Sequence, residues 1–325
     1  MTDSKTLVPE DFFADPSGRV FNDRLYIYPS HDRRTNIPDD DNGSQYDMAD
    51  YHVLSMGEIG GEVTVHGKAF GVEDVPWAER QLWAPDCAFK HGKYYFYFPA
   101  RDREGVFRIG VAVSDTPEGP FTPEREPIRG SFSIDPAVLV DDDGEAYLYF
   151  GGIWGGQLQC WRTGQFDPDA YSTMEASRDE DALMPKVAKL SQDMKSFESG
   201  VQDLIINDDI DGKPIRAGRH DRRFFEAAWM HKRGGKYYFS YSTGDTHYIV
   251  YAMGDSPMGP FTYAGRILEP VQGWTTHHSI VEFRGKWYLC YHDTSISGEN
   301  NLRSAKIREL VYDDQGHIKL AQPQA

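Results

Sequence analysis

Four residues of types that perform acid–base or metal chemistry occur at related positions: Asp15, Asp135, Glu226 and His277. Hydrolysis of a glycosidic bond needs one carboxylic acid that protonates the leaving oxygen and one carboxylate that activates water. Glu226 lies in the apolar segment RRFFEAAWM, whose aromatic side chains should raise its pKa. Asp15, followed by proline and short polar residues, should stay ionised. We therefore expect Glu226 as general acid, Asp15 as general base, and Asp135 as a third carboxylate that keeps Glu226 protonated and in position.

Each of these residues also has a purely structural interpretation. An Asp-Pro pair, as at positions 15 and 135, usually marks a turn or the entry to a strand. A glutamate before Ala-Ala-Trp is more often a paired core residue, and a single histidine is most often a hydrogen-bonded core residue. Only a shared position in a repeat shifts the balance toward function.

Such a repeat exists. Five short aromatic strands, each preceded by Gly, Asp or Asn, are predicted at 22–28, 91–98, 143–152, 234–242 and 284–293. A second short strand precedes each of them, which predicts five hairpins. Counting back 11 or 12 residues from the aligned tyrosines Tyr26, Tyr95, Tyr147, Tyr238 and Tyr288 gives Asp15, Ala84, Asp135, Glu226 and His277.

The repeat predicts an all-β fold, a five-bladed β-propeller that forms a single domain over residues 1–325. Segments 114–121 and 254–261 share a Pro/Gly turn after a further strand, so each unit holds three or four strands. The innermost strands of a propeller begin at one mouth of a central channel, where the five repeat positions would meet. Residues 161–222 form an insertion in the third blade, which we expect to consist of loops and one extra hairpin and to wall the pocket.

Composition limits the partners. The 325 residues carry a formal net charge of −17, which disfavours nucleic acid and anionic lipid surfaces and leaves a neutral small molecule or oligosaccharide as the expected substrate. No apolar run is long enough to cross a membrane. The odd, widely spaced cysteines and the absence of an export signal lead us to expect a cytoplasmic protein with buried, reduced thiols. The oligomeric state has no signature in the sequence.

Taken together, the motifs ADPS at 14–17, WAPD at 83–86, IDPAV at 134–138, FEAAW at 225–229 and HHSIVEFRGKWYLCYHD at 277–293 resemble glycoside hydrolase family 43 over essentially the whole chain. The resemblance implies a five-bladed propeller and a reaction that inverts the anomeric centre. It implies Asp15 as base, Glu226 as acid and Asp135 as the residue that tunes and orients the acid. It also implies that His277 helps hold a calcium ion in the channel, partly through water, and that Arg303 contacts the carboxylate group.

The remaining site predictions concern the sugar and the metal. We expect Trp83, Ala84, Trp154 and Phe225 to bind substrate together with Arg303. The motif Thr276-His277-His278 replaces the Gly-His pair of many family members, which leaves open which histidine faces the axis. Two further tryptophans, Trp229 and Trp274, are expected in the core. The acidic runs 39–41 and 141–143 are interpreted as solvated turns, and 207–212 as a hairpin turn, since a calcium loop would need glutamate where Gly218 stands.

The motifs resemble most the exo-acting branch of the family. We expect release of terminal L-arabinofuranose from arabinoxylan- or arabinan-derived oligosaccharides, ahead of β-D-xylosidase activity on xylo-oligosaccharides, with a bifunctional enzyme as an intermediate case. An endo-arabinanase with an open groove is a further alternative. The non-enzymatic alternative is a propeller that binds carbohydrate without catalysis.

Overall fold

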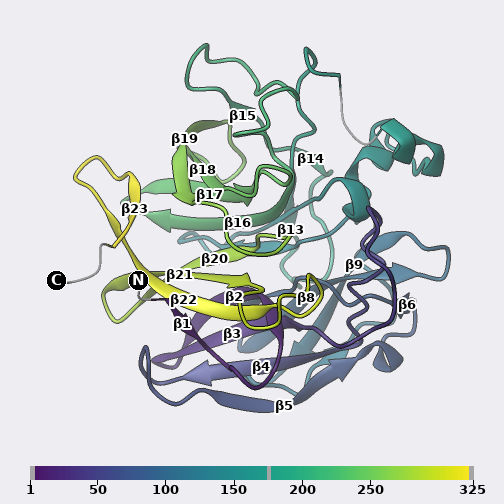
Figure 1. Ribbon diagram of the computed structural model, residues 1–325, viewed down its shortest axis with the longest axis vertical. Helices are drawn as coiled ribbons and strands as arrows, with labels where there is room; N and C mark the ends of the chain where they lie inside the picture. The colour runs from purple at the N-terminus through teal and green to yellow at the C-terminus, as the bar shows by residue number, and fades with distance from the viewer. Residues whose placement is uncertain (1–3, 174–176, 322–325) are drawn as a thin grey trace.

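The computed structural model describes residues 4–173 and 177–321, which form five mainly antiparallel sheets around a central channel (Figure 1). The predicted all-β, five-bladed β-propeller is confirmed. In the described residues the only helices are short 3₁₀ turns: η1 (Val72–Asp74), η2 (Trp154–Gly156), η3 (Leu158–Trp161) and η4 (Pro168–Thr173). None of the helices in this part of the chain has the length and apolar character needed to span a bilayer.

The first two sheets contain the first two predicted hairpins as their inner strands. The first sheet is ordered β2 (Phe13–Phe21), β3 (Arg24–His31), β4 (Asp50–Met56) and β5 (Thr64–Gly71). In the second sheet, β8 (Lys93–Asp102) pairs with β7 (Asp86–Lys90), β9 (Phe107–Ser114) and β6 (Ala78–Arg80), and β10 (Thr122–Pro123) extends β9.

The other three sheets repeat this plan. The third is ordered β11 (Ala137–Val140), β12 (Ala146–Phe150), β13 (Lys186–Leu190) and β14 (Gln202–Asp203). The fourth is ordered β16 (Glu226–Arg233), β17 (Lys236–Ser242), β18 (Ile249–Gly254), β19 (Phe261–Leu268) and β15 (Ile206–Asn207). The fifth is ordered β20 (His278–Phe283), β21 (Lys286–Asp293), β22 (Ser304–Tyr312) and β1 (Lys5–Thr6), with β23 (Ile318–Leu320) also paired to β22.

Two-residue turns explain why the inner hairpins form. Both turn residues have positive φ in four of the five hairpins, as a type I′ turn requires, and they are Asn22-Asp23, His91-Gly92, Gly234-Gly235 and Arg284-Gly285. The twist of such turns matches the twist of the strands they join, so the sequence fixes the register of each hairpin locally. The Gly, Asp and Asn residues that marked the repeat are thus turn residues.

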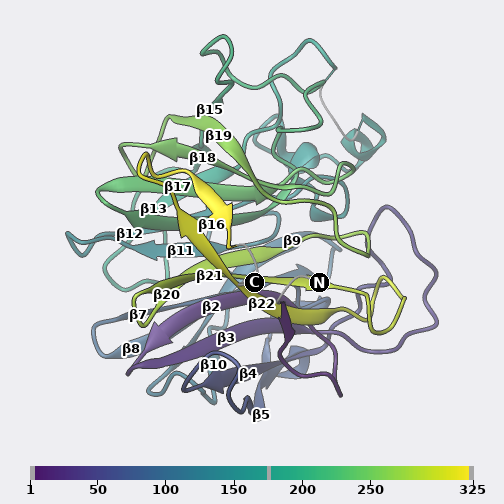
Figure 2. The same ribbon diagram turned by 60° about the vertical axis from the view of Figure 1, so that its left-hand side comes forward.

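Aromatic side chains hold neighbouring sheets together. Between the first and second sheets, for example, the rings of Tyr28 and Phe96 meet edge to face with centroids 5.6 Å apart. Buried apolar clusters of the same kind join the other sheets, and one of them links the first sheet to the fifth. β2 lies beside β20 and β21 in Figures 1 and 2, which closes the ring. Cys87, Cys160 and Cys290 are buried in this core as free thiols.

An arginine and an aspartate cross the channel slightly further along the inner strands than the repeat positions, with Arg19 four residues after Asp15 and Asp86 two residues after Ala84. Arg19 pairs with Asp86, donates to the carbonyl of Val138 at 2.7 Å, and stacks over the ring of Trp229 at 4.3 Å. Asp86 also accepts hydrogen bonds from Ser17 and from two backbone amides. We call these residues the Arg19 cluster; it connects the inner strands of four sheets.

The insertion at 161–222 differs from its prediction. It contributes β13 and β14, which complete the third sheet, and β15, which pairs in parallel with the edge of the fourth sheet. The extra hairpin is present, with Asn207 bridged to Pro214. The insertion does not wall the pocket, since no pocket-lining residue found in the described structure comes from it. Pairing with outer strands carries this segment to the periphery of the ring, where its teal helical turns are visible in Figure 1.

Candidate active site

The five repeat positions meet in one pocket. A cavity of about 250 Å³ lies where the inner strands begin, and Asp15, Ala84, Asp135, Glu226 and His277 all line it. Each comes from a different sheet or from the residues directly before its inner strand. Rotational repetition of one hairpin therefore brings together side chains that are far apart in the sequence.

Local backbone irregularities aim the carboxylates into this pocket. The register of β2 shifts between Ala14 and Ser17, and that of β16 shifts between Glu226 and Trp229. Asp15 and Asp135 themselves have φ of 48° and 57°, and Ala227 has φ of 62°. Non-glycine residues rarely adopt this conformation, and bulges commonly redirect side chains beside active sites. The strain thus lies at two acidic positions of the repeat and directly after the third, Glu226.

Asp15 is held as an ionised carboxylate. One of its oxygens accepts a hydrogen bond from Ser30 Oγ at 2.6 Å, and the other accepts from Arg303 at 3.0 Å. The backbone amide of Asp15 donates to His292 Nδ1 at 3.0 Å, so a neighbouring ring is fixed against it. Burial alone would raise the pKa of Asp15, but the charge of Arg303 and the contact with His292 outweigh burial and hold this pKa well below its usual range.

Arg303 owes its position to a second aspartate. Its guanidinium forms a bidentate pair with Asp32, through contacts of 2.8 and 2.7 Å, and presents its remaining nitrogen to Asp15 and Thr275. The same group lies over the ring of Tyr46, 4.7 Å from its centroid. A planar guanidinium gripped in this way is a fixed positive charge beside Asp15.

Glu226 has the opposite electrostatic environment. Burial and the charge of Asp15 raise the pKa of Glu226 to about 7, against the opposing charge of Arg303. Burial and Glu226 together also raise the pKa of Asp135. The backbone amide of Ala227 donates to Asp135 at 2.7 Å, which favours the ionised form of that carboxylate and opposes the upward shift of its pKa. Near neutral pH the pocket thus pairs a protonated glutamic acid with an ionised aspartate.

His277 is the histidine that lines the pocket. Its Nδ1 lies 3.6 Å from Asp135 Oδ2 and 3.9 Å from Asp15 Oδ1. Burial, with help from His292 and Arg303, lowers the pKa of His277 to about 4 despite the charge of Asp15, so the ring is neutral at pH 7. His278 points away from the pocket, where it contacts Ser240 Oγ at 2.7 Å. The structure thus distinguishes two histidines that the sequence could not.

Aromatic residues form the walls. Trp83, Ala84, Trp154 and Phe225, the predicted sugar-binding residues, all line the pocket, as does Arg303. The prediction for Trp274 was wrong: it lines the pocket and stacks on Trp154, with centroids 5.6 Å apart and planes 19° from parallel. Its own segment precedes β20 outside any regular strand, so no periodicity revealed which way the ring points.

Sequence reasoning also missed an acidic wall. Asp39, Asp40 and Asp41 were interpreted as a solvated turn, yet all three line the pocket together with Tyr46 and Asn300. The three aspartates and Tyr46 belong to the loop of residues 32–49 between β3 and β4, which we call the wall loop. A charged turn has the same composition whether it faces bulk water or the mouth of a pocket. The only available signal was the length of the loop.

Comparison with known proteins agrees with this geometry. The profile of Glycosyl hydrolases family 43 matches residues 65–318. A xylosidase/arabinosidase, 43A, of Humicola insolens is 62% identical over 98% of this chain and 99% of its own, and a β-xylosidase of Xylanibacter ruminicola is 54% identical over 97% and 98%.

A solved structure is similarly close. It is a β-xylosidase/α-arabinofuranosidase from a compost microbial metagenome, described as a calcium-free complex with xylotriose. It superposes with a TM-score of 0.96 and 58% identity, covering 100% of this chain and 98% of the other. The propeller, the carboxylate trio at its mouth and these relatives lead to one conclusion: the chain is a glycosidase that belongs to glycosyl hydrolase family 43.

Proposed function

We propose that this glycosidase is an inverting, exo-acting enzyme that removes single pentose units, both β-D-xylosyl and α-L-arabinofuranosyl, from the ends of short oligosaccharides. The observation that carries the proposal is the pairing of a protonated Glu226 with an ionised Asp15 at the bottom of one small pocket. Relatives named for both activities support dual specificity, and the neighbour solved with xylotriose supports an oligosaccharide substrate. The sequence ranked arabinose first, whereas these names support xylose at least equally.

The chemistry follows from the two protonation states. Glu226 donates its proton to the glycosidic oxygen as the bond to the anomeric carbon breaks. Asp15 accepts a proton from a water molecule whose oxygen bonds to that carbon from the opposite face, so the configuration inverts. Burial and the charge of Glu226 raise the pKa of Asp135, so the two carboxyl groups interact, and we assign Asp135 the role of tuning and orienting the acid through this interaction and through its contact with Ala227. Arg303 keeps Asp15 ionised before each turnover.

The shape of the pocket supports exo action. Its lining comes from the wall loop and from the beginnings of the inner strands of all five sheets or the residues just before them, an arrangement that favours the end of a chain. Its volume of about 250 Å³ is small beside typical ligand pockets of roughly 300–1,000 Å³. Trp83, Trp154 and Trp274 supply flat apolar faces that suit the C–H surfaces of a sugar ring. A terminal pentose fits such a site better than the interior of a polymer does.

We also propose that calcium binds beside His277. Calcium prefers six to eight oxygen ligands, whereas His277 offers a nitrogen, and the nearest carboxylate oxygens of Asp15 and Asp135 already accept hydrogen bonds. These residues fit a calcium ion held through water, with the two carboxylates supplying negative charge. When bound, the ion would add positive charge beside Asp15. Chelation, followed by a melting curve and a rate measurement, separates a catalytic from a structural role.

The test uses nitrophenyl β-D-xyloside and α-L-arabinofuranoside, with each sugar also added as a competitor of the other. One shared site predicts competitive inhibition in both directions and loss of both activities in Glu226→Gln. Xylotriose should yield xylose and xylobiose first, and NMR of the initial product should show the inverted anomer. Mixed oligomers from linear arabinan without monomer release would indicate an endo-acting enzyme, and sugar binding without turnover would indicate a binding protein.

A further inference from the structure

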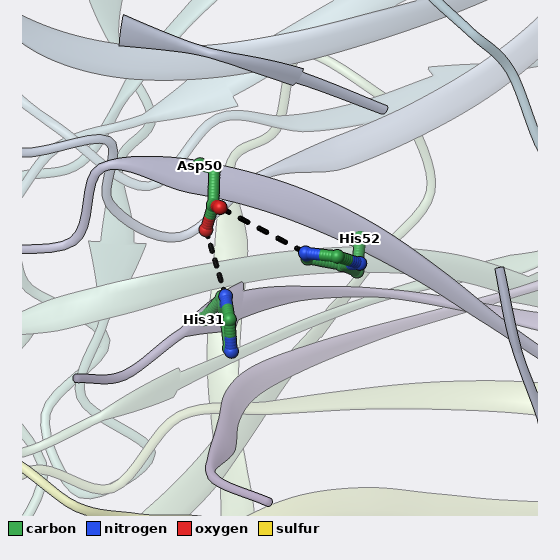
Figure 3. Close-up of side chains that lie close together, drawn as sticks. All are labelled: His31, Asp50 and His52. Atoms are coloured by element: carbon green, nitrogen blue, oxygen red, sulfur yellow. Dashed lines mark hydrogen bonds and ion pairs between the residues drawn. The ribbon is translucent and has the colours of Figure 1, made fainter. Parts of the chain in front are cut away.

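A second cluster of ionisable residues lies outside the pocket, at the base of the wall loop. His31 ends β3, directly before the loop, and Asp50 and His52 begin β4, directly after it. One ligand atom from each of the three lies within 4.8 Å of the others, and all three side chains are half-buried. Figure 3 shows both imidazole rings pointing at the Asp50 carboxylate. None of these residues takes part in the glycosidase chemistry described above.

The distances suit a small transition-metal ion. His31 Nδ1 lies 2.7 Å from one Asp50 oxygen, and His52 Nε2 lies 3.8 Å from the other. Tetrahedral zinc with bonds of about 2.0–2.2 Å places its ligand atoms roughly 3.3 Å apart, between these two values. Small side-chain rotations would thus complete a set of two histidines and one carboxylate, with a position left for water.

The outer nitrogens of both rings already have acceptors. His52 Nδ1 lies 3.1 Å from the carbonyl oxygen of His66, so a proton on Nδ1 leaves the lone pair of Nε2 facing Asp50. His31 Nε2 lies 3.4 Å from Asp11, so a proton there frees Nδ1 in the same way. Metal-binding histidines almost always donate their second N–H to a carboxylate or carbonyl group. Two independent rings share this arrangement around one carboxylate.

Packing and charge agree with this geometry. The ring of Phe13 stacks on His31, with centroids 5.0 Å apart and planes 23° from parallel, which fixes the plane of that imidazole. Nearby Lys68 is paired with Glu73, so its charge is neutralised and the cluster remains net negative through Asp11 and Asp50. Because the histidine and aspartate side chains are 21–32% exposed, an ion can reach them from solvent.

We propose that His31, Asp50 and His52 form a binding site for zinc or a similar divalent transition-metal ion, which fastens the two ends of the wall loop together. The loop carries Asp32, the partner of Arg303, and Tyr46, which lines the pocket. An ion at its base would therefore restrict the motion of one wall of the glycosidase pocket. The site is distinct from the proposed calcium position beside His277 and needs neither calcium nor turnover.

The test is calorimetric titration of the full chain with zinc chloride at pH 7.5, after EDTA treatment and dialysis. We expect one zinc ion per chain at this site. Asp50→Asn and His52→Gln should weaken binding at least about 100-fold, and Asp11→Asn, which alters only the support of His31, about tenfold. His66→Gln is the matched control: its side chain contacts Ser55, and only its backbone carbonyl serves the cluster, so zinc binding should not change.

Two further measurements keep the outcome decisive. His277→Gln should retain zinc binding, and loss of binding in that variant but not in Asp50→Asn would place the ion in the catalytic pocket and overturn the proposal. Circular dichroism without metal establishes that each variant is folded, and the exposed Asp11 provides a milder variant should Asp50→Asn unfold. Zinc should also slow hydrogen exchange in residues 33–49 of the unmodified chain only. Unchanged exchange despite binding would refute the fastening of the loop.

Discussion

Two buried arginine–aspartate clusters occupy the channel, and they differ in how completely their hydrogen bonds are made. In the Arg19 cluster, Asp86 accepts from Arg19, Ser17, Val138 N and its own neighbouring amide. In the pocket, Arg303 and its aspartates are equally well satisfied, but the Glu226 carboxyl group receives no hydrogen bond from residues 4–173 or 177–321. The hydrogen bonds of the Arg19 cluster are all made, whereas the pocket contains a carboxyl group that can still form hydrogen bonds with a ligand.

The difference separates structural from chemical use of the same residue types. A buried carboxylate with every lone pair occupied has nothing left to offer a substrate, and it connects strands instead. Glu226 keeps its proton because its site withholds the partners that would ionise it. Charge and burial alone do not distinguish the Arg19 cluster from the pocket. The hydrogen bonds that each carboxylate accepts do distinguish them.

The largest expected effect is that of Glu226→Gln. The amide cannot protonate the leaving group, so kcat should fall by about 10²–10⁴-fold while sugar binding persists. Steady-state kinetics on both nitrophenyl glycosides, with calorimetric titration of xylose, measure the two quantities. Retention of more than a tenth of the activity would show that Glu226 is not the general acid. The distinction between a structural Arg19 cluster and a chemically active Glu226 would then fail.

Asp86→Asn should act on stability alone. It leaves the partly exposed Arg19 without its charge partner, which should lower the free energy of unfolding by about 3 kcal/mol, the lower end of the range for a buried pair. At 25 °C the folded variant should keep its kcat and KM, since neither Asp86 nor Arg19 is among the residues that line the pocket. Urea unfolding and kinetics test both statements, with Asp115→Asn in the exposed pair with Lys93 as the control that changes neither. A selective loss of kcat would show that the two clusters are coupled.

The pH dependence should be one-sided over the ordinary range. The active form needs Glu226 protonated, and its pKa of about 7 means that kcat/KM should fall about tenfold per pH unit above that value. Asp15 must be ionised, and its strongly lowered pKa keeps it so well into the acid range, so no acid limb is expected between pH 5 and 7. A rate that increases through pH 7 would contradict the assignment of acid and base.

The smallest effect is expected at Tyr46. Its hydroxyl oxygen is buried and, within the described part of the chain, has no hydrogen-bond partner, yet the residue lines the pocket. A small rotation of the ring on substrate binding would expose this oxygen to a sugar hydroxyl, so we expect Tyr46→Phe to raise KM about 2–10-fold, with little change in kcat. The melting temperature should hold or rise, because the variant loses an unsatisfied polar group. An unchanged KM would place this hydroxyl with the structural groups.

The sequence predicted the architecture because the repeat is local. Each hairpin is encoded by its own turn residues, such as Asn22-Asp23, and the offset back from the aligned tyrosines then located Asp15, Asp135 and Glu226 without any long-range information. Their meeting in one pocket follows from rotational symmetry alone.

What the sequence could not predict depends on contacts between distant segments. Asp32 and His292, which fix Arg303 and Asp15, carry no local signal, because their partners lie 271 and 277 positions away. The run 39–41 resembles any hydrophilic turn until the ring brings it to the pocket mouth. The insertion was misjudged for a related reason: the short strand β13 is recognisable only beside β12.

The seam of the ring has a consequence for Arg303. β1 pairs with the first half of β22, through Lys5 opposite Ile307, and β23 pairs with its second half. β22 begins at Ser304, immediately after Arg303. The two short strands near the ends of the chain thus pair with the same edge of β22, the one opposite β21, each with a different half of it. Arg303, whose guanidinium keeps Asp15 charged, immediately precedes this strand. Fusion tags or deletions that displace β1 or β23 should therefore change the pKa of Asp15 before they unfold the propeller.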